Sequence, residues 1–319
     1  MPSRTSILVA AARAFGSREP DATVRNPDML ADLLIGPEEL ALISEHPISR
    51  INDLDYSDAS EVVAIVVITF YLLLRTRFID EAMEKAVRAG ATQVVVLGAG
   101  FDSRAYRFAK LLKDCRVIEV DAAPTQKYKL RRLEAALIDI PSNVAYARID
   151  FARDDLRQVL RSAGLRPDEK TFYIWEGVCM YLPESSVRAT LRAIVRASAP
   201  GSSLVLDYSN RQWLDALRGQ PPGPLALPST WAEPWLFGVP DSGGREFFRE
   251  LGFETGVAFA TTDPELCKRY AMRANGSMYG APVFQRMRAD AVARVAAGES
   301  LPPAMAALWI AELVVPAYA

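Results

Sequence analysis

The clearest chemical pattern in the chain is a glycine pair followed, one apolar run later, by an acid. Gly98-Ala99-Gly100 comes directly after residues 94–97, and Asp121 ends the apolar run 116–121. Glycine lets a backbone turn tightly beside a ligand, and the free N–H groups at a helix start favour polar or anionic atoms. An acid about twenty residues further on can accept hydrogen bonds from both hydroxyls of a ribose. The spacing favours a nucleotide-type cofactor, although glycine turns also close many strands that bind nothing.

The elements that must position these residues alternate between strand-like and helix-like segments. Short runs rich in β-branched and aromatic residues predict strands at 94–97, 116–121, 145–150, 171–176, 203–207, 254–261 and 309–316. The segments between the first five runs have helical spacing, and 283–296 is helix-like as well. Strands alternating with helices predict a parallel sheet that is covered on both faces.

The first ninety residues and one later segment do not follow this alternation. Helical patterns at 6–15, 27–34, 37–44 and 59–89 predict a helical cap, and the very apolar run 62–74 is too short for a bilayer and predicts a buried helix. The Pro/Gly/Trp-rich segment 220–244 contains Trp231, Trp235 and Phe237, which need burial. It is either a lid over a substrate pocket or a packed loop.

Composition excludes several classes of function. The chain has 319 residues, 50% of them hydrophobic and 24% charged, with a formal net charge of -2, so neither nucleic acid nor an anionic membrane is an expected partner. Three widely spaced cysteines and a single histidine give no metal-binding pattern, and we expect no metal. Sparse cysteines and an N-terminal apolar stretch (7–12) that is short for a secretory signal predict a cytoplasmic protein.

Several blocks of sequence resemble a known family. They lie at 75–80 (RTRFID), 93–107 (QVVVLGAGFDSRAYR), 119–121 (EVD), 150–151 (DF) and 175–183 (WEGVCMYLP). Together they resemble the leucine carboxyl methyltransferase superfamily, and most closely its bacterial branch of S-adenosylmethionine-dependent O-methyltransferases, some of which act on polyketides. The resemblance implies an α/β fold of class I methyltransferase type: a Rossmann-like, seven-stranded mixed sheet with an N-terminal helical cap and a lid-like insert. We expect one domain, with the cap at 1–90, the cofactor-binding core at 91–210, the insert at 211–250 and C-terminal strands with a helical insertion at 251–319.

The resemblance also implies S-adenosylmethionine as cofactor and a set of cofactor contacts. Arg75 is expected to pair with the cofactor carboxylate, a bidentate match for a guanidinium. Asp102 either holds the cofactor ammonium or caps a helix. Asp121 corresponds to the ribose acid, and Asp150 with the backbone of Phe151 to the adenine pair. The full set is Arg75, Gly98, Ala99, Gly100, Asp102, Asp121, Asp150, Phe151 and Glu176.

Each of these residues has a purely structural alternative. Arg75 could be a surface arginine, Asp150 a turn residue and Glu176 a carboxylate held by backbone N–H groups. Tyr181 either contacts the acceptor or packs as an ordinary aromatic side chain. The chain also departs from the family pattern, because Ala123 stands where a proline is common and proline follows as Pro124.

The predicted reaction is methyl transfer to an oxygen of a small-molecule metabolite. The resemblance to the bacterial branch implies that this metabolite could be polyketide-like. An ionised carboxylate needs no base, whereas a phenol or alcohol gains from one. His46, the single histidine, is the candidate base, with a capping or solvated role as its alternative. A nicotinamide-dependent oxidoreductase stays open, although Ser103 replaces the third glycine of that fingerprint. A cofactor-binding protein without turnover also stays open, as does the oligomeric state.

Overall fold

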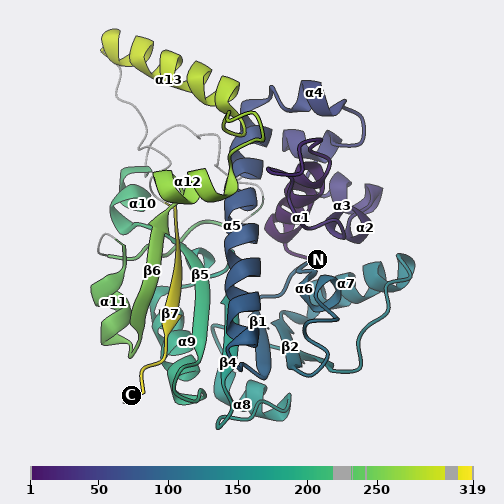
Figure 1. Cartoon of the computed structure of the whole chain (residues 1–319), viewed down its shortest axis with the longest axis vertical. Coiled ribbons are helices and arrows are strands. Elements are labelled where there is room, and N and C mark those ends of the chain that lie inside the picture. The colour runs from purple at the N-terminus through teal and green to yellow at the C-terminus, as the bar shows by residue number, and fades with distance from the viewer. Residues whose placement is uncertain (1, 218–230, 232, 241–242, 299–307, 318–319) are drawn as a thin grey trace.

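A seven-stranded mixed sheet forms the centre of the chain (Figure 1). The computed structural model describes residues 2–217, 231, 233–240, 243–298 and 308–317. The strand order is β3-β2-β1-β4-β5-β7-β6; the first five are parallel, and β7 runs antiparallel to β5 and β6. The strands are β1 (Gln93–Leu97), β2 (Arg116–Asp121), β3 (Val144–Arg148), β4 (Thr171–Trp175), β5 (Ser203–Ser209), β6 (Glu254–Ala260) and β7 (Leu308–Val314). The predicted seven-stranded mixed sheet is confirmed, with strand limits that differ by only a few residues.

Side chains that alternate along the strands divide the core into two layers. Val94 and Val96 of β1 pack in the layer on one face, and Val95 and Leu97 pack in the layer on the other. All five residues of β1 are buried. This is the pattern of a parallel sheet covered on both faces, in which successive side chains point to opposite sides.

Helices cover both faces of the sheet. One layer holds α1 (Arg4–Ser17), α5 (Val63–Arg88), α7 (Ala123–Ala135) and α12 (Pro264–Tyr270). The other holds α8 (Leu156–Ser162), α9 (Glu184–Arg196) and α11 (Arg245–Glu250). The apolar run 62–74 lies almost entirely within α5, the long helix that crosses the middle of Figure 1, and its buried side chains confirm the predicted buried helix.

The N-terminal helices lie beside α5 and form the predicted cap (Figure 1). After α1 come α2 (Ala31–Leu34), α3 (Pro37–Ala41), the 3-10 turn η1 (Pro47–Arg50) and α4 (Tyr56–Ala59). The helix expected from residue 27 begins only at Ala31. Asn26 and Asp28 accept hydrogen bonds from the backbone N–H groups of Asp28 and Ala31, at 3.0 and 3.2 Å, and these side-chain bonds hold residues 26–30 in turns.

The remaining elements are α6 (Arg104–Arg107), η2 (Cys179–Tyr181), α10 (Arg211–Leu217) and α13 (Ala281–Ala296), the last standing out from the body of the molecule in Figure 1. Helix α11 falls within the expected insert, yet Phe247 and Phe248 are buried in the core layer under it. Most of the segment 220–244 lies outside the described residues. That this segment is either a lid or a packed loop stays a prediction.

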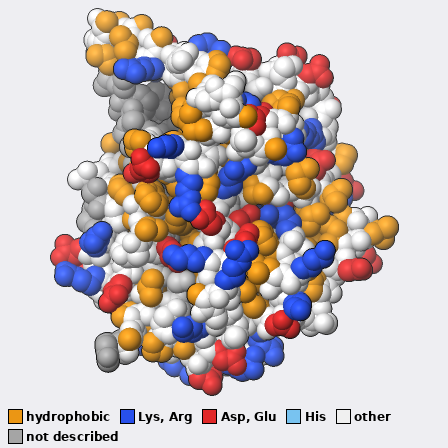
Figure 2. Space-filling model, in the orientation of Figure 1, with side chains coloured by type: hydrophobic (Ala, Val, Ile, Leu, Met, Phe, Trp, Pro, Cys, Tyr) orange, Lys and Arg blue, Asp and Glu red, His pale blue; other side chains and the backbone are white. Residues whose placement is uncertain are grey.

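The charge distribution on the surface and the length and polarity of the helices are those of an ordinary globular chain. Figure 2 shows acidic and basic side chains interspersed over the visible face, as the small net charge leads one to expect. Within the described residues, every helix is too short or too polar to cross a bilayer.

One buried ion pair joins the sheet to a covering helix. Lys129 of α7 donates to Glu119 of β2 at 2.6 Å, and both side chains are almost fully buried. Burial raises the pKa of Glu119, and the neighbouring Lys129 opposes that rise. A buried pair of this kind gives little net stability, but removing one partner leaves a charge without compensation.

We therefore expect Lys129→Met to lower the free energy of unfolding by about 3–5 kcal/mol, because Glu119 loses its partner. The double variant Glu119→Gln/Lys129→Met should recover much of that loss. Urea denaturation of the three proteins measures both effects. A single-variant loss below about 1 kcal/mol would show that the pair is solvated rather than buried.

Candidate functional site

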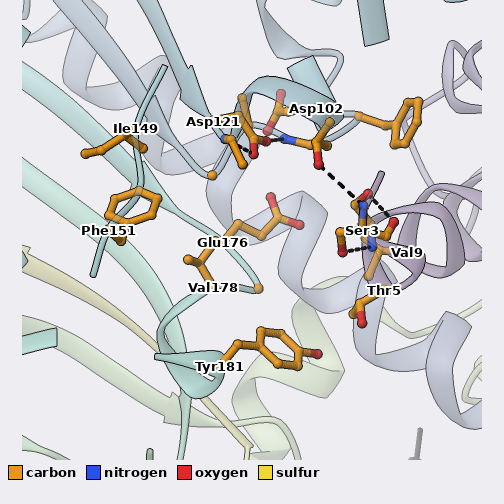
Figure 3. A pocket seen from close by; sticks show the side chains of 18 of the residues that line it. Ser3, Thr5, Val9, Asp102, Asp121, Ile149, Phe151, Glu176, Val178 and Tyr181 are labelled. Atoms are coloured by element: carbon orange, nitrogen blue, oxygen red, sulfur yellow. Dashed lines mark hydrogen bonds between the residues drawn. The ribbon is translucent and has the colours of Figure 1, made fainter. Parts of the chain in front are cut away.

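A cavity of about 810 Å³ lies at the carboxyl ends of the central strands. Its walls come from the start of α1, the loop after β1, the ends of β2, β3 and β4, and residues 233–236. Figure 3 shows Ile149 and Phe151 on one side and Thr5 on the other, with Glu176 between them, Asp121 above it and Tyr181 below it. The crevice beyond the carboxyl ends is where open α/β sheets bind ligands.

The glycine loop forms the floor of this cavity for steric reasons. Gly98 and Gly100 have φ angles of +68° and +45°, which side-chain-bearing residues rarely adopt. A Cβ on Gly98 would lie 2.3 Å from Cγ2 of Val178. The N–H groups of Gly98 and Ala99 both donate to the carbonyl of Val120, which ties the loop to β2. The predicted glycine residues therefore allow the backbone of this loop to line the cavity directly.

Asp121 closes the loop from the end of β2. It accepts a hydrogen bond from the N–H of Gly100 and another, at 2.6 Å, from the N–H of Ala122. Burial raises the pKa of Asp121, and these two N–H donors oppose the rise. The carboxylate is thus fixed in the cavity wall at the place where the sequence predicts the ribose acid.

Glu176 is the centre of a buried charge cluster. Its carboxylate lies 2.6 Å from Nη1 of Arg104, 2.8 Å from Nε of Arg75 and 3.8 Å from Nη1 of Arg13. Burial alone would raise the pKa of Glu176, but the guanidinium groups of Arg75, Arg104 and Arg13 hold it well below its usual range. Glu176 is therefore an ionised carboxylate inside the protein.

The cluster extends behind the cavity wall. Arg75 also contacts Asp207 of β5 at 2.7 Å, and Arg13 contacts Asp28 at 2.8 Å. Arg104 and Arg107 share Asp80, at 2.7 and 2.9 Å. These contacts link four arginines and five carboxylates, all of them nearly buried: Arg13, Arg75, Arg104, Arg107, Asp28, Asp80, Asp102, Glu176 and Asp207. The cluster has one formal negative charge in excess.

Asp102 lies one residue before Ser103, the N-cap of α6, and its side chain caps the first helical N–H, which is close to the role that the sequence left as an alternative. It accepts a hydrogen bond at 2.7 Å from the N–H of Arg104, the first residue of α6, and it contacts the Arg104 guanidinium. Burial would raise the pKa of Asp102, but Arg104 keeps it lowered. Asp102 also lines the cavity, so the cap and a contact to a ligand are compatible.

Three polar atoms of cavity-lining residues are buried without a hydrogen bond among the described residues: Nε of Arg13, Nε of Arg75 and Oε1 of Glu176. Oε1 of Glu176 and Nε of Arg75 lie 2.8 Å apart but are poorly aligned for a hydrogen bond to each other. A buried acceptor of this kind costs free energy unless a donor reaches it. The ammonium group of the expected cofactor is such a donor, so these residues fit that cofactor.

Asp150 and Phe151 lie at the far side of the cavity from Tyr181 (Figure 3 labels Phe151). Asp150 is exposed, accepts from the N–H of Ala152 at 3.0 Å and lies 3.5 Å from Arg153, which is the turn role left open by the sequence. The Phe151 ring lies 6.3 Å from that of Trp175. Both residues are in place to border an adenine ring, and that contact stays a prediction.

Tyr181 ends the 3-10 turn η2 and lines the other side of the cavity. Its ring meets that of Trp235 edge-on at 6.5 Å. Burial raises the pKa of Tyr181 to about 12, so its hydroxyl is a neutral donor at physiological pH. The predicted position of Tyr181 beside an acceptor is compatible with this geometry.

Sequence reasoning missed Glu233, whose side chain reaches across the cavity to the start of α1. Its Oε1 accepts from the N–H of Arg4 at 3.0 Å, and its Oε2 accepts from the N–H of Thr5 at 3.0 Å and from the hydroxyl of Ser3 at 3.2 Å. The Thr5 hydroxyl also donates to it. The only signal was an acid inside the apolar segment 220–244, and nothing in that segment indicated its partners.

His46 is not among the described residues that line the cavity, and its role as a catalytic base stays a prediction. It caps η1, and its Nδ1 accepts from the N–H of Ile48 at 3.1 Å. The side chain is buried, and burial lowers the pKa of His46 to about 4. The capping alternative accounts for all of these contacts. Within the described residues, no cluster of acids, cysteines and histidine suits a metal ion, so the expectation of no metal stays a prediction.

Comparison with known proteins identifies relatives of this chain. The family model described as leucine carboxyl methyltransferase matches residues 6–195. A candidate S-adenosyl-L-methionine-dependent methyltransferase of Streptomyces coelicolor is 33% identical over 219 residues, which cover 68% of this chain and 69% of the relative. A second one from the same organism is 31% identical and covers 74% of this chain and 78% of the relative. One from Bacillus subtilis is 29% identical over 65% of this chain and 71% of the relative.

Solved structures resemble this chain more distantly. The glycopeptide N-methyltransferase MtfA, complexed with S-adenosyl-L-homocysteine, has a TM-score of 0.41 and 15% identity, with 75% of this chain and 87% of that chain covered. A sarcosine dimethylglycine methyltransferase candidate from Galdieria sulphuraria has a TM-score of 0.42 and 11% identity, with 75% and 83% covered.

Asp121→Ala tests the predicted ribose contact. We expect S-adenosylhomocysteine to bind about 30- to 150-fold more weakly, because two charge-assisted hydrogen bonds are worth about 2–3 kcal/mol. Calorimetric titration measures the change. Asp114→Ala, at the exposed opposite end of β2, is the matched control and should bind like the unaltered chain. Unchanged affinity in Asp121→Ala would refute the assignment.

His46 should make stability depend on pH between about 6.5 and about 4. Its pKa is lower in the folded chain, so the unfolded chain binds the extra proton in this window and stability falls as the pH falls. The loss should reach on the order of 3 kcal/mol and level off below the folded-state pKa.

The matched variant for this test is His46→Asn, whose amide oxygen can still accept from Ile48 as a cap. Urea denaturation of both proteins across the window isolates the histidine, because the chain has only one. Parallel pH profiles for the two proteins would show that His46 titrates normally and is not buried.

Proposed function

Because the chain belongs to the leucine carboxyl methyltransferase family, we propose that it transfers the methyl group of S-adenosylmethionine to an oxygen atom of a small-molecule acceptor. It is a S-adenosylmethionine-dependent methyltransferase with the class I Rossmann-like fold. The nicotinamide-dependent alternative is wrong, because both the family match and the relatives indicate S-adenosylmethionine. The choice of an oxygen and of a small molecule is our inference.

The observation that carries the cofactor assignment is the buried Oε1 of Glu176 in the cavity wall, which pairs in charge with Arg75 but accepts no hydrogen bond from the described residues. An amino-acid ammonium placed there gains a charge-assisted hydrogen bond and removes the cost of an unsatisfied acceptor. Arg75 uses Nε and Nη1 toward Glu176 and Asp207, and its guanidinium still borders the cavity beside Gly177. It would hold the cofactor carboxylate, while Asp121 would hold the ribose.

Two features support an oxygen of a small molecule as the acceptor. The matching family is described by methylation of a carboxyl group, which is an oxygen acceptor. The cavity has the size of a small-molecule site, and Glu233 bridges it to α1, so an aromatic or polyketide-like metabolite suits it better than a folded protein surface. Tyr181 and Leu236 give that end an apolar wall with one neutral hydroxyl.

The chain's part in the reaction is mainly to hold the reactants in line. When bound, the cofactor would supply a methyl group activated by its bond to a sulfonium sulfur, and the acceptor oxygen would have to lie opposite that sulfur to attack the methyl carbon. Positioning of this kind can lower the barrier by on the order of 7–11 kcal/mol. The glycine loop and Glu176 would hold one reactant, and the walls at Thr5, Tyr181 and Leu236 would border the other.

Calorimetric titration with S-adenosylhomocysteine, with NAD in parallel, tests the cofactor site. We expect micromolar binding of the first and none of the second. Incubation with S-adenosylmethionine carrying a trideuterated methyl group, and mass spectrometry of hydroxylated and carboxylated aromatic acceptors, then tests turnover and the atom methylated. Label found only on nitrogen would overturn the oxygen assignment, and a bound cofactor without any transfer would favour a binding protein.

A further inference from the structure

The cavity carries an excess of negative charge. Its described lining residues include three arginines, Arg13, Arg75 and Arg148. Against them stand six carboxylates: Asp102, Asp121, Asp150, Asp154, Glu176 and Glu233. The formal excess is three negative charges, of which the single positive charge of S-adenosylmethionine compensates one.

Carboxylates lie at both ends of the cavity, with Asp121 and Asp150 at one end and Glu233 at the other. Asp121, Asp150 and Phe151 border the end where the sequence predicts the adenosine part. The proposed cofactor site therefore leaves the end at Thr5, Tyr181 and Glu233 for the acceptor.

The acceptor end contains a carboxylate and lacks a free cation among its described residues. Arg13 and Arg75, the nearest lining arginines, are engaged with Asp28, Glu176 and Asp207 in the buried cluster. The other lining groups at this end are hydroxyls and apolar side chains: Ser3, Thr5, Tyr181, Leu182, Pro234 and Leu236.

The contacts of Glu233 hold its carboxylate in one position at the start of α1. Four donors from the start of α1 approach its two oxygens. Three of these use Oε2, whereas Oε1 accepts only from Arg4 among the described residues, so Oε1 keeps a lone pair for one further donor. An acceptor hydroxyl or ammonium can donate to that oxygen, whereas a carboxylate would be repelled by it.

We propose that Glu233 selects the acceptor by charge: the enzyme methylates a neutral hydroxyl compound, or one that also carries a positive charge, and rejects acceptors that present a carboxylate. The inference rests on the proposed function, since it takes the Glu233 end as the acceptor end. It narrows that function from an oxygen of either kind to a hydroxyl. In the step, the hydroxyl oxygen forms the bond to the methyl carbon, the carbon–sulfur bond breaks toward sulfur, and the hydroxyl proton passes to solvent.

Three ring-matched probes test the proposal on protein saturated with S-adenosylhomocysteine: 2-naphthol, 2-naphthylmethylamine and 2-naphthoate. At about pH 7 they are neutral, cationic and anionic. Calorimetric titration should show naphthoate binding about tenfold or more weakly than naphthol, with the amine at least as tight as naphthol. Glu233→Gln removes the charge and keeps the shape of the side chain. It should lower the ratio of the naphthoate Kd to the amine Kd about tenfold.

Glu254→Gln is the matched control, because it makes the same charge change at an exposed position on β6. It should leave the ratio of the naphthoate Kd to the amine Kd as it is in the unaltered chain. The proposal would be overturned if naphthoate bound as tightly as naphthol, if Glu233→Gln left this ratio unchanged, or if no probe bound. Failure of S-adenosylhomocysteine itself to bind would instead refute the proposed cofactor function, so the two failures are distinguishable.

Discussion

The ionised carboxylate of Glu176, held inside the protein, is the constraint on which the rest of the site depends. A buried carboxylate is costly unless cations and hydrogen bonds compensate it. Here the compensation comes from three separate segments: Arg13 of α1, Arg75 of α5 and Arg104 of α6. The helical cap, the loop after β1 and the end of β4 must therefore meet at one point before the charge is tolerated. The cap is thus part of the electrostatic structure of the site and more than a cover over it.

The same cluster shows why the site is incomplete without a ligand. Its carboxylates exceed its arginines by one, and Oε1 of Glu176 is buried without a hydrogen bond among the described residues. A cation with N–H donors resolves both imbalances at once. The unsatisfied acceptor and the excess charge destabilise the ligand-free chain, and binding of such a cation removes both costs. The ligand-bound state is therefore more stable than the free one. The proposed cofactor would therefore both complete the site and stabilise the fold.

The sequence predicted those parts of the molecule that depend on local patterns. All seven strands follow from short β-branched runs, and the glycine loop with Asp121 follows from its position after two of them. The buried helix α5 follows from its unbroken apolar run. Contacts between distant segments were beyond the same reasoning: Glu233 and Thr5 are 228 positions apart, and nothing local pairs them. His46 was ambiguous for a similar reason, because a histidine before proline suits either a cap or a base until its surroundings are known.

The two ends of the cavity are held by contacts of different strength. At the cofactor end, glycine φ angles, core strands and a buried ion cluster fix the wall, and no member of it can move without exposing a charge or breaking the sheet. At the other end, Glu233 bonds to N–H groups that any helix leaves unpaired in its first turn, and Leu236 and Phe237 bond to the carbonyl of Met180. Each of these bonds is worth on the order of 1 kcal/mol, much less than an uncompensated buried charge. The wall at the Glu233 end is therefore held by weaker contacts than the wall formed by the glycine loop and Glu176.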